Sequence, residues 1–177
     1  MKLFNCSTIL LLAILFFAGE PVFAQRKKPA RKVRTASATN NLIKNGIQLK
    51  INGFKVSDAY LMFDDENLVP EDNKVDLNQN VNMILIIEEG WNETGGGVFP
   101  GSKQVIKLSN GKEISNSEDL FAAFDETGVS TEEARYITLN AQVTDPKTRK
   151  NTVVVNFRVW DKKGAAEITG SYKLYIK

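Results

Sequence analysis

Two side chains that carry much of enzyme chemistry are scarce in this sequence: among its 177 residues there is no histidine and one cysteine, Cys6. Their scarcity excludes Cys and His nucleophiles, the Ser-His-Asp triad, zinc held by Cys and His, haem held by His, and a disulfide framework. Phosphate-loop, dinucleotide-binding and metalloprotease signatures are absent too. Carboxylates remain, as in glycosidases, but no spacing singles out a pair of them. We therefore expect a protein that is not an enzyme and uses no cofactor or metal.

The first 24 residues have the three parts of a secretory signal peptide: a charged start at Lys2, an apolar run over 9–17, and small residues before Gln25. The apolar run is about half the length that a membrane-spanning helix needs. We expect cleavage between Ala24 and Gln25 and an exported protein, periplasmic or on the cell surface. Basic residues directly after the cut argue against easy export, because positive charge tends to stay on the cytoplasmic side.

Residues 25–44 have almost no side chain able to bury apolar surface, which predicts a disordered arm before a folded domain over 45–177. The arm carries Arg26, Lys27, Lys28, Arg31, Lys32 and Arg34. From residue 41 onward the chain has 16 basic and 20 acidic residues, a net charge of −4. The arm either attaches to an anionic lipid or polysaccharide or is a solvated tether. We do not expect nucleic acid as a partner, because the folded part is acidic and the arm lacks aromatic residues for stacking.

From Ile47 onward, apolar residues alternate with polar ones, which predicts strands. The segment Val81 to Ile87 is apolar on both faces and is predicted to be a central strand covered on both sides. Asn110-Gly111 predicts a hairpin. One short helix is expected after Ser115, with Glu118 completing a capping box and Leu120, Phe121 and Phe124 forming its apolar stripe.

The last third of the sequence predicts three antiparallel strands in a meander, over 136–143, 153–160 and 168–176. A four-residue turn between Trp160 and Ala165 places Phe157 opposite Ile168 and Arg158 opposite Glu167. The preceding hairpin, joining Thr144 to Thr152, places Tyr136 opposite Trp160 on the outward face.

The C-terminal residues Phe157, Val159, Asp161 and Gly164 are followed by a strand with Tyr172, Leu174 and Ile176. This ending resembles the final hairpin of bacterial immunoglobulin-like domains, which often run F-x-V-x-D-x-x-G and then Y-x-L-x-I. The resemblance covers about twenty residues, and the disulfide pair of antibody domains is missing. Together with about eight strands and one helix, it implies an all-β, antiparallel two-sheet sandwich of immunoglobulin-like type. Such domains serve as spacers, adhesion modules, binding modules or parts of envelope assemblies.

Two groups of aromatic residues are candidate binding sites. Trp160 and Tyr136, beside Arg158 and Asn156, form a predicted platform for a sugar ring; the alternative is that Trp160 is covered and belongs to a small second core. The loop over 89–101 carries Trp91 and Phe99 and either binds a partner or folds back onto the core. A cluster of acidic residues over 64–76 fits no EF-hand, so a solvated turn is expected there rather than calcium.

These observations favour a non-enzymatic, exported binding or structural domain of the bacterial cell envelope, which engages another envelope protein through a sheet face or the loop over 89–101. The first alternative is a carbohydrate-binding module that uses Trp160 and Tyr136. The second is attachment to anionic lipid or polysaccharide through the basic arm.

Overall fold

The computed structural model describes residues 42–177. The expected signal peptide, its cleavage site and the six basic residues of the arm lie outside the described residues. Leu42 and Ile43, which fall in the segment assigned to the arm, form the first strand and pair with residues 58 and 59. Within the described range, no helix has the length and apolar character needed to cross a membrane.

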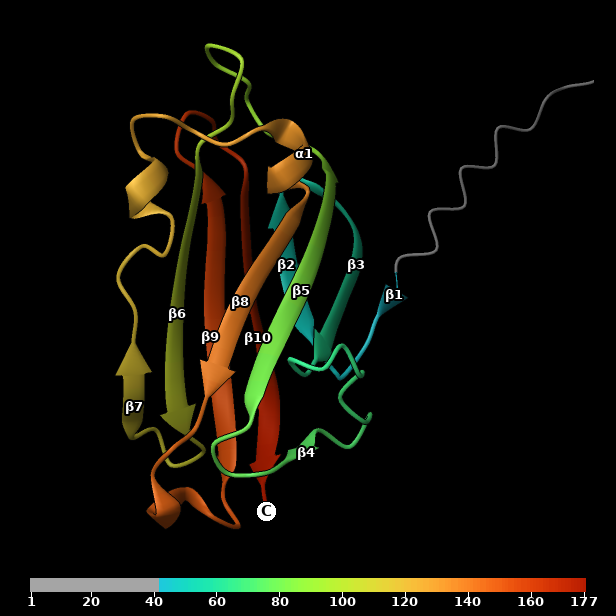
Figure 1. Cartoon of the computed structure of the whole chain (residues 1–177), viewed down its shortest axis with the longest axis vertical. Coiled ribbons are helices and arrows are strands. Elements are labelled where there is room, and N and C mark those ends of the chain that lie inside the picture. Colours follow the sequence, from blue (N-terminus) through green and yellow to red (C-terminus); the bar gives the residue numbers. More distant parts are fainter. Residues whose placement is uncertain (1–41) are drawn as a thin grey trace, which may run out of the picture. The chain divides into compact units, whose positions relative to one another are not determined.

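The described residues form two β-sheets packed face to face (Figure 1). The four-stranded sheet has the order β1-β3-β5-β8, and the six-stranded sheet has the order β2-β10-β9-β6-β7, with β4 also paired to β10. The strands are β1 (Leu42–Ile43), β2 (Gln48–Asn52), β3 (Lys55–Met62), β4 (Lys74–Val75), β5 (Asn80–Glu89), β6 (Pro100–Leu108), β7 (Glu113–Asn116), β8 (Tyr136–Gln142), β9 (Thr152–Asp161) and β10 (Glu167–Ile176). The helical elements are η1 (Ala122–Phe124), α1 (Thr131–Ala134) and η2 (Pro146–Thr148). The prediction of an all-β two-sheet sandwich is confirmed.

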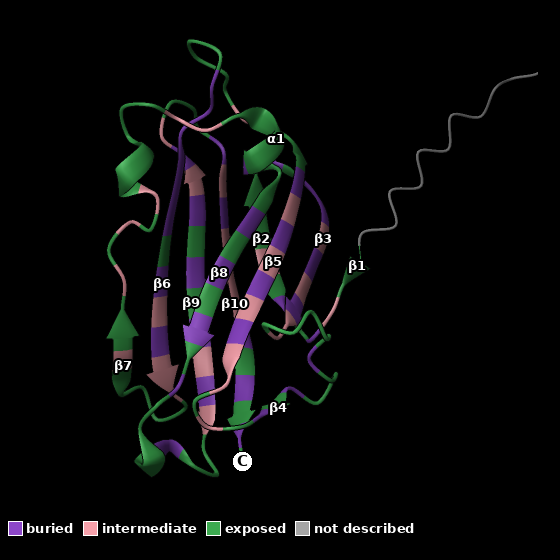
Figure 2. Ribbon diagram, viewed as in Figure 1, coloured by how far each residue is buried: buried purple, intermediate pink, exposed green. Residues whose placement is uncertain are grey.

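The core lies between the two sheets, because buried residues alternate with exposed or half-buried ones along the long strands (Figure 2). Each sheet turns one apolar face inward, as expected for sheets that pack about 10 Å apart. The largest fully buried side chains come from both sheets: Leu61, Met83, Leu85, Ile87, Ile137, Leu139, Ile168, Tyr172 and Leu174. The sandwich is therefore held by inward side chains that the period-two pattern identifies in the sequence.

The hairpin of β9 and β10 forms as predicted, but its register is two residues different. Phe157 lies opposite Gly170 rather than Ile168, and Glu167 lies opposite Trp160. The reason is that Asp161 extends β9: its N–H donates to the carbonyl of Ala166 at 3.0 Å, so the turn begins one residue later than expected. The side chains of Arg158 and Glu167 still form an ion pair, now diagonally, with an Nε to Oε2 distance of 2.9 Å.

The predicted three-strand meander is wrong at its first strand. β8 pairs antiparallel with β5 in the four-stranded sheet, so Tyr136 lies opposite Ile86 and not opposite Trp160. Between β8 and β9 the chain crosses to the other sheet through η2, which begins where the Asp145 side chain accepts a hydrogen bond from the N–H of Lys147 at 2.9 Å. The segment between the two strands is long enough to cross between packed sheets, whereas a tight hairpin is not.

The Asn110-Gly111 hairpin is confirmed between β6 and β7. The helix expected after Ser115 is wrong, because Ser115 belongs to β7 and the backbone beyond it stays bonded to β6: the N–H groups of Ser117 and Leu120 donate to β6 carbonyls at 2.8 and 2.9 Å. Of the predicted stripe only Phe124 falls in a helical element, η1. The short α-helix instead begins at Thr131, behind a capping box that Ser130 and Glu133 form.

β5 lies between β3 and β8, so its prediction as a central strand is confirmed. Its coverage on both faces is not, because Ile84 and Ile86 are half-buried on the outward side while Met83 and Leu85 are fully buried on the inward side. The four-stranded sheet therefore turns apolar side chains of a central strand toward solvent.

Candidate binding surfaces

The aromatic residues of the loop over 89–101 fold back onto the protein. Trp91 packs against the core edge-to-face with Phe54, with ring centroids 4.6 Å apart, and its indole N–H is buried. Phe99 is buried beneath Gly128, and the ammonium group of Lys163 lies 4.9 Å from the centre of its ring. Of the two interpretations of this loop, the structure supports the one in which both rings pack against the fold. Phe99 is buried and Trp91 is half-buried.

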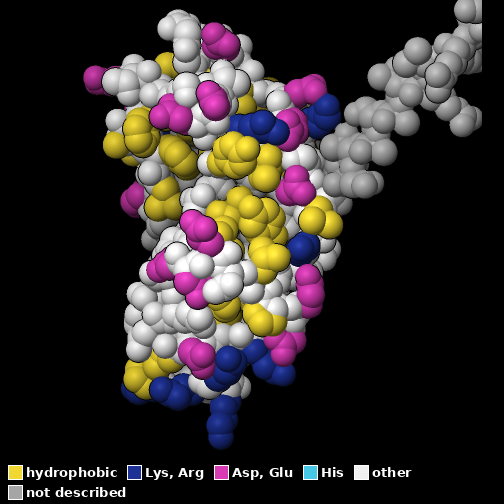
Figure 3. Space-filling model, turned by 45° about the vertical axis from the view of Figure 1, so that its right-hand side comes forward, with side chains coloured by type: hydrophobic (Ala, Val, Ile, Leu, Met, Phe, Trp, Pro, Cys, Tyr) yellow, Lys and Arg dark blue, Asp and Glu magenta, His cyan; other side chains and the backbone are white. Residues whose placement is uncertain are grey.

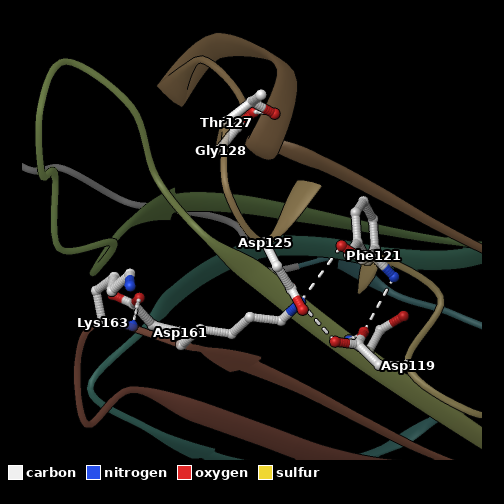
Figure 4. Close-up of polar contacts among 9 residues, drawn as sticks. Asp119, Phe121, Asp125, Thr127, Gly128, Asp161 and Lys163 are labelled. Atoms are coloured by element: carbon white, nitrogen blue, oxygen red, sulfur yellow. Dashed lines mark hydrogen bonds and ion pairs between the residues drawn. The ribbon is translucent and has the colours of Figure 1, made fainter. Parts of the chain in front are cut away.

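Ion pairs and hydrogen bonds link the loops at this end of the sandwich (Figure 4). Lys162, in the turn after β9, forms ion pairs with Asp119, at 2.5 Å, and with Asp125, both in the segment between β7 and α1. Asp119 also accepts hydrogen bonds from the N–H groups of Ser102 and Phe121 at 2.9 and 3.0 Å. The cluster joins three segments that are far apart in the sequence.

The pKa values of this cluster follow from its geometry. Burial alone favours neutral Lys162 and neutral Asp119. For Lys162 the hydrogen bonds and charges of Asp119 and Asp125 outweigh burial and raise the pKa of the ammonium group. For Asp119 the hydrogen bonds from Lys162 and from two backbone N–H groups outweigh burial and lower the pKa of the carboxyl group. Both groups are therefore charged at neutral pH, and their role here is structural.

Trp160, Arg158 and Asn156 follow each other on the outward face of β9, in the six-stranded sheet. The Trp160 ring covers Gly101 on β6, where a Cβ atom would lie only 2.2 Å from the ring. The guanidinium group of Arg158 lies 4.7 Å from the centre of the Trp160 ring and is held by Glu167. Trp160 is half-buried, so part of its ring remains accessible on this face.

A shallow depression of about 510 Å³ lies on the same sheet, next to these residues. It is lined by three neighbouring strands, with the polar residues Gln48, Lys50, Asn156, Thr169 and Ser171 beside the apolar residues Leu49 and Phe157. Amides, hydroxyls and an ammonium group of this kind suit a polar ligand with many hydroxyl groups.

Tyr136 lies on the other sheet, at the start of β8, and is 53% exposed. The guanidinium group of Arg135 lies 5.5 Å from the centre of its ring and also forms an ion pair with Glu88 at 2.8 Å. Because Tyr136 and Trp160 belong to different sheets, the predicted Trp-Tyr platform does not form. The predicted pairing is wrong because β8 lies beside β5 and not beside β9.

Tyr136 belongs instead to a cluster of large apolar side chains on the outward side of the four-stranded sheet. We call this cluster the apolar face; its members are Tyr60, Met62, Ile84, Ile86 and Tyr136. Tyr60 lies opposite Ile84, and Ile86 lies opposite Tyr136, so the side chains are cross-strand neighbours. Figure 3 shows hydrophobic side chains gathered over the sheet that holds β3, β5 and β8.

The acidic residues over 64–76 take part in local structure. Asp64 accepts hydrogen bonds from the amides of Asn80 and Asn82 at 2.7 and 2.8 Å, and Asp72 forms an ion pair with Lys74 at 2.9 Å. Among residues 42–177, no three His, Cys, Asp or Glu side chains come together in a way that could hold a metal ion.

Comparisons with known proteins give no family for this chain. No protein-family model matches the sequence, and a search of curated proteins found no match. Among solved structures, the fold is similar to one described as "Crystal structure of the C-terminal domain of wzt", with 11% sequence identity and a TM-score of 0.48. The similarity covers 75% of this chain and 78% of that chain. The function therefore has to be argued from the residues of this chain.

Sequence reasoning missed the apolar face. Its only signal was the run VNMILII, in which Ile84 and Ile86 are apolar at positions where a half-buried strand would carry polar residues. That run was interpreted as a strand covered on both faces. The structure shows that the same pattern marks a half-buried apolar surface that no second sheet covers within residues 42–177.

Proposed function

We propose that this protein is a non-enzymatic, exported binding domain of the bacterial cell envelope, and that the apolar face engages another envelope protein. The observation that carries the proposal is the apolar face itself: four large side chains are half-buried there, and Tyr136 is 53% exposed. Contiguous apolar side chains on a soluble protein typically mark an interaction surface. Aromatic residues and Met are also the types enriched at the centre of protein interfaces.

An immunoglobulin-like arrangement of the strands supports the role of a binding domain. The order β3-β5-β8 corresponds to strands A-B-E, and β10-β9-β6-β7 corresponds to G-F-C-C′ of immunoglobulin-like sandwiches. In that correspondence, the place of strand D lies beside β8, and no strand within residues 42–177 occupies it. On the basis of this strand order, we propose that the domain is of the immunoglobulin-like class.

The test is cross-linking with mass spectrometry in the native host envelope, with the tagged full-length protein and the mature N-terminus read in the same run. We expect an N-terminus at Gln25 and cross-links to one or two defined proteins. The double variant Ile84→Gln, Ile86→Gln should lose these cross-links. Val154→Gln is the matched control, because Val154 is an outward, half-buried, β-branched residue in a central strand of the other sheet.

Three results would contradict the proposal. An uncleaved N-terminus would contradict export. Cross-links that survive in the Ile84→Gln, Ile86→Gln variant, with the same partners as the wild type, would move the interface away from the apolar face. Equal loss in the Val154→Gln control would show that the effect comes from general destabilisation rather than from the surface.

A carbohydrate-binding function is the second candidate, now without Tyr136. The observation that favours it is the combination of a half-buried Trp160 with the depression that Asn156 helps to line. The ring offers an apolar face to a sugar, and the neighbouring amides and hydroxyls offer hydrogen bonds. A glycan array should then show binding that Trp160→Ala abolishes while the melting temperature changes little. An array without signal would remove this candidate.

A further inference from the structure

β8 is the last strand of the four-stranded sheet, and only β5 pairs with it among residues 42–177. The carbonyl of Arg135 accepts a hydrogen bond from Ile87 N–H at 2.8 Å, so the odd-numbered residues of this stretch bond toward β5. In an antiparallel pair, alternate residues point their backbone groups in opposite directions. The backbone N–H and C=O groups of Tyr136, Thr138, Asn140 and Gln142 therefore point to the open side.

This edge lacks the features by which proteins usually protect an edge strand. Natural edges are short, charged, bulged or interrupted by proline. β8 reads YITLNAQ, with no charge, proline or glycine, and it pairs with β5 in unbroken register over seven residues. The other edges are protected: β2 carries Lys50, β7 begins with Glu113, and β1 has only two residues. Among residues 42–177, β8 is the long edge strand that is open to strand addition.

One side chain reaches the open edge from the other sheet. The Gln104 amide donates to the carbonyl of Asn140 at 2.7 Å, and its own oxygen is buried without a hydrogen-bond partner in the part of the chain that the structure describes. A carbonyl oxygen has two lone pairs, so Asn140 remains able to accept a second hydrogen bond. Gln104 therefore contacts the edge but leaves the backbone of β8 able to pair with another strand.

We propose that β8 pairs antiparallel with β8 of a second copy of this chain, so that two four-stranded sheets become one continuous sheet. With the two-fold axis at Leu139, the middle of the strand, Thr138 faces Asn140 of the second copy and Tyr136 faces its Gln142. All four residues with outward backbone groups then find partners, and each pair exchanges two hydrogen bonds. On the inner side the same register brings Leu139 next to Leu139 and Ile137 next to Ala141.

Charge complementarity is the reason for choosing a second copy as the occupant. The antiparallel arrangement brings α1, which precedes β8, close to η2, which follows β8 in the other copy. Glu132 in α1 and Lys147 in η2 are both exposed, and neither forms an ion pair within residues 42–177. The two-fold symmetry forms this contact twice, as expected for an interface between identical surfaces.

The first test measures the mass in solution of the full chain, as the host processes it, by light scattering and sedimentation over a range of concentrations. We expect a dimer. Thr138→Pro removes an outward N–H without removing a bond to β5, and it should weaken the dimer about tenfold or more in Kd. Thr138→Lys should act in the same direction, whereas Ser115→Lys, in the exposed edge strand β7, should leave the dimer unchanged. A monomeric wild type, or a dimer that persists in both Thr138 variants, would overturn the proposal.

The second test fixes the register and does not depend on variants that disturb the strand. In a Cys6→Ser background, a mixture of Thr138→Cys and Asn140→Cys chains should form a disulfide-linked dimer faster than either variant alone. Residues directly opposite each other across a hydrogen-bonded pair have Cα atoms about 5.5 Å apart, within the range of a disulfide. A mixture that cross-links no faster than the separate variants would contradict pairing centred on Leu139.

Discussion

The outward faces of the two sheets differ in chemistry although the inward faces are alike. On the four-stranded sheet, the outward residues include Tyr60, Ile84, Ile86 and Tyr136, and its last strand has no charge. On the six-stranded sheet, charged and polar side chains such as Arg158, Glu167 and Lys173 dominate, and an edge strand carries Lys50. Solvation alone explains the second face and not the first.

The features of the four-stranded sheet do not contribute to the packed core. An outward Ile in a central strand adds nothing to the packed core, because its side chain points away from it. Nor does an unprotected edge improve folding, since it invites pairing with other chains. The four-stranded sheet is therefore the part of the molecule whose outward apolar residues and open edge are not explained by folding alone.

The largest expected effect concerns the six-stranded sheet and its dependence on one glycine. Gly170 lies opposite Phe157, whose ring occupies the space of a side chain: a Cβ atom there would meet the ring at 2.3 Å and the backbone oxygen of Gln48 at 2.7 Å. Gly170→Val should therefore lower the free energy of unfolding by about 3 kcal/mol, measured by chemical denaturation. Ser171→Val, one residue on with its side chain outward, should stay within about 0.5 kcal/mol. Equal effects at both positions would mean that Phe157 moves aside readily.

The next effect tests whether the two sheets are coupled through the loops at one end. Lys162 belongs to the hairpin of the six-stranded sheet, and Asp119 belongs to the segment that leads to β8. Lys162→Met leaves the carboxylate of Asp119 without its cation, so we expect a loss of about 1 to 2 kcal/mol in unfolding free energy. Lys173→Met is the control, because Lys173 is exposed and its ammonium forms no ion pair within residues 42–177. Similar losses in both variants would contradict a specific role for Lys162.

The pattern of apolar residues was sufficient to predict the fold class, because alternation identifies the inward residues of each strand whatever its neighbour is. The hairpins at Asn110-Gly111 and between β9 and β10 were also predictable, since a tight turn determines which strands pair. The place of β8 was not, because the segment after it is long enough either to turn back or to cross to the other sheet. The local sequence does not determine which of those two paths the chain takes.

The candidate sites show the same limit. For Trp91 and Phe99 the sequence left two alternatives open, and in the structure both rings pack against the fold. The capping box at Ser130 and Glu133 was overlooked in favour of Ser115 and Glu118, which have the same spacing. What separates the two is the hydrogen bonding of residues 117–120 to β6, a tertiary interaction that a helix-cap rule does not include.

A pH titration follows from the cluster around Lys162. The pKa of Asp119 is lower in the folded state, so its contribution to stability is present above its unfolded pKa of about 3.9 and is lost as the pH falls through the folded value. The difference in stability between the wild type and Asp119→Asn should therefore be constant from about pH 5 to pH 8 and shrink below about pH 4. A difference that keeps its full size at about pH 2 would mean that the aspartate acts through packing rather than charge.

The smallest expected effect concerns the charged face itself. Arg158 lies against the Trp160 ring and forms an ion pair with Glu167, but both charged side chains are in contact with solvent, at 51% and 37% exposed. A double-mutant cycle with Arg158→Met and Glu167→Gln should give a coupling energy of about 0.2 to 1 kcal/mol that decreases with added salt. Since Arg158 also holds the ring, Arg158→Met should change Trp160 fluorescence more than Glu167→Gln does. A coupling well above this range, insensitive to salt, would mean that the pair is shielded from water, and the six-stranded sheet would then have a covered surface of its own.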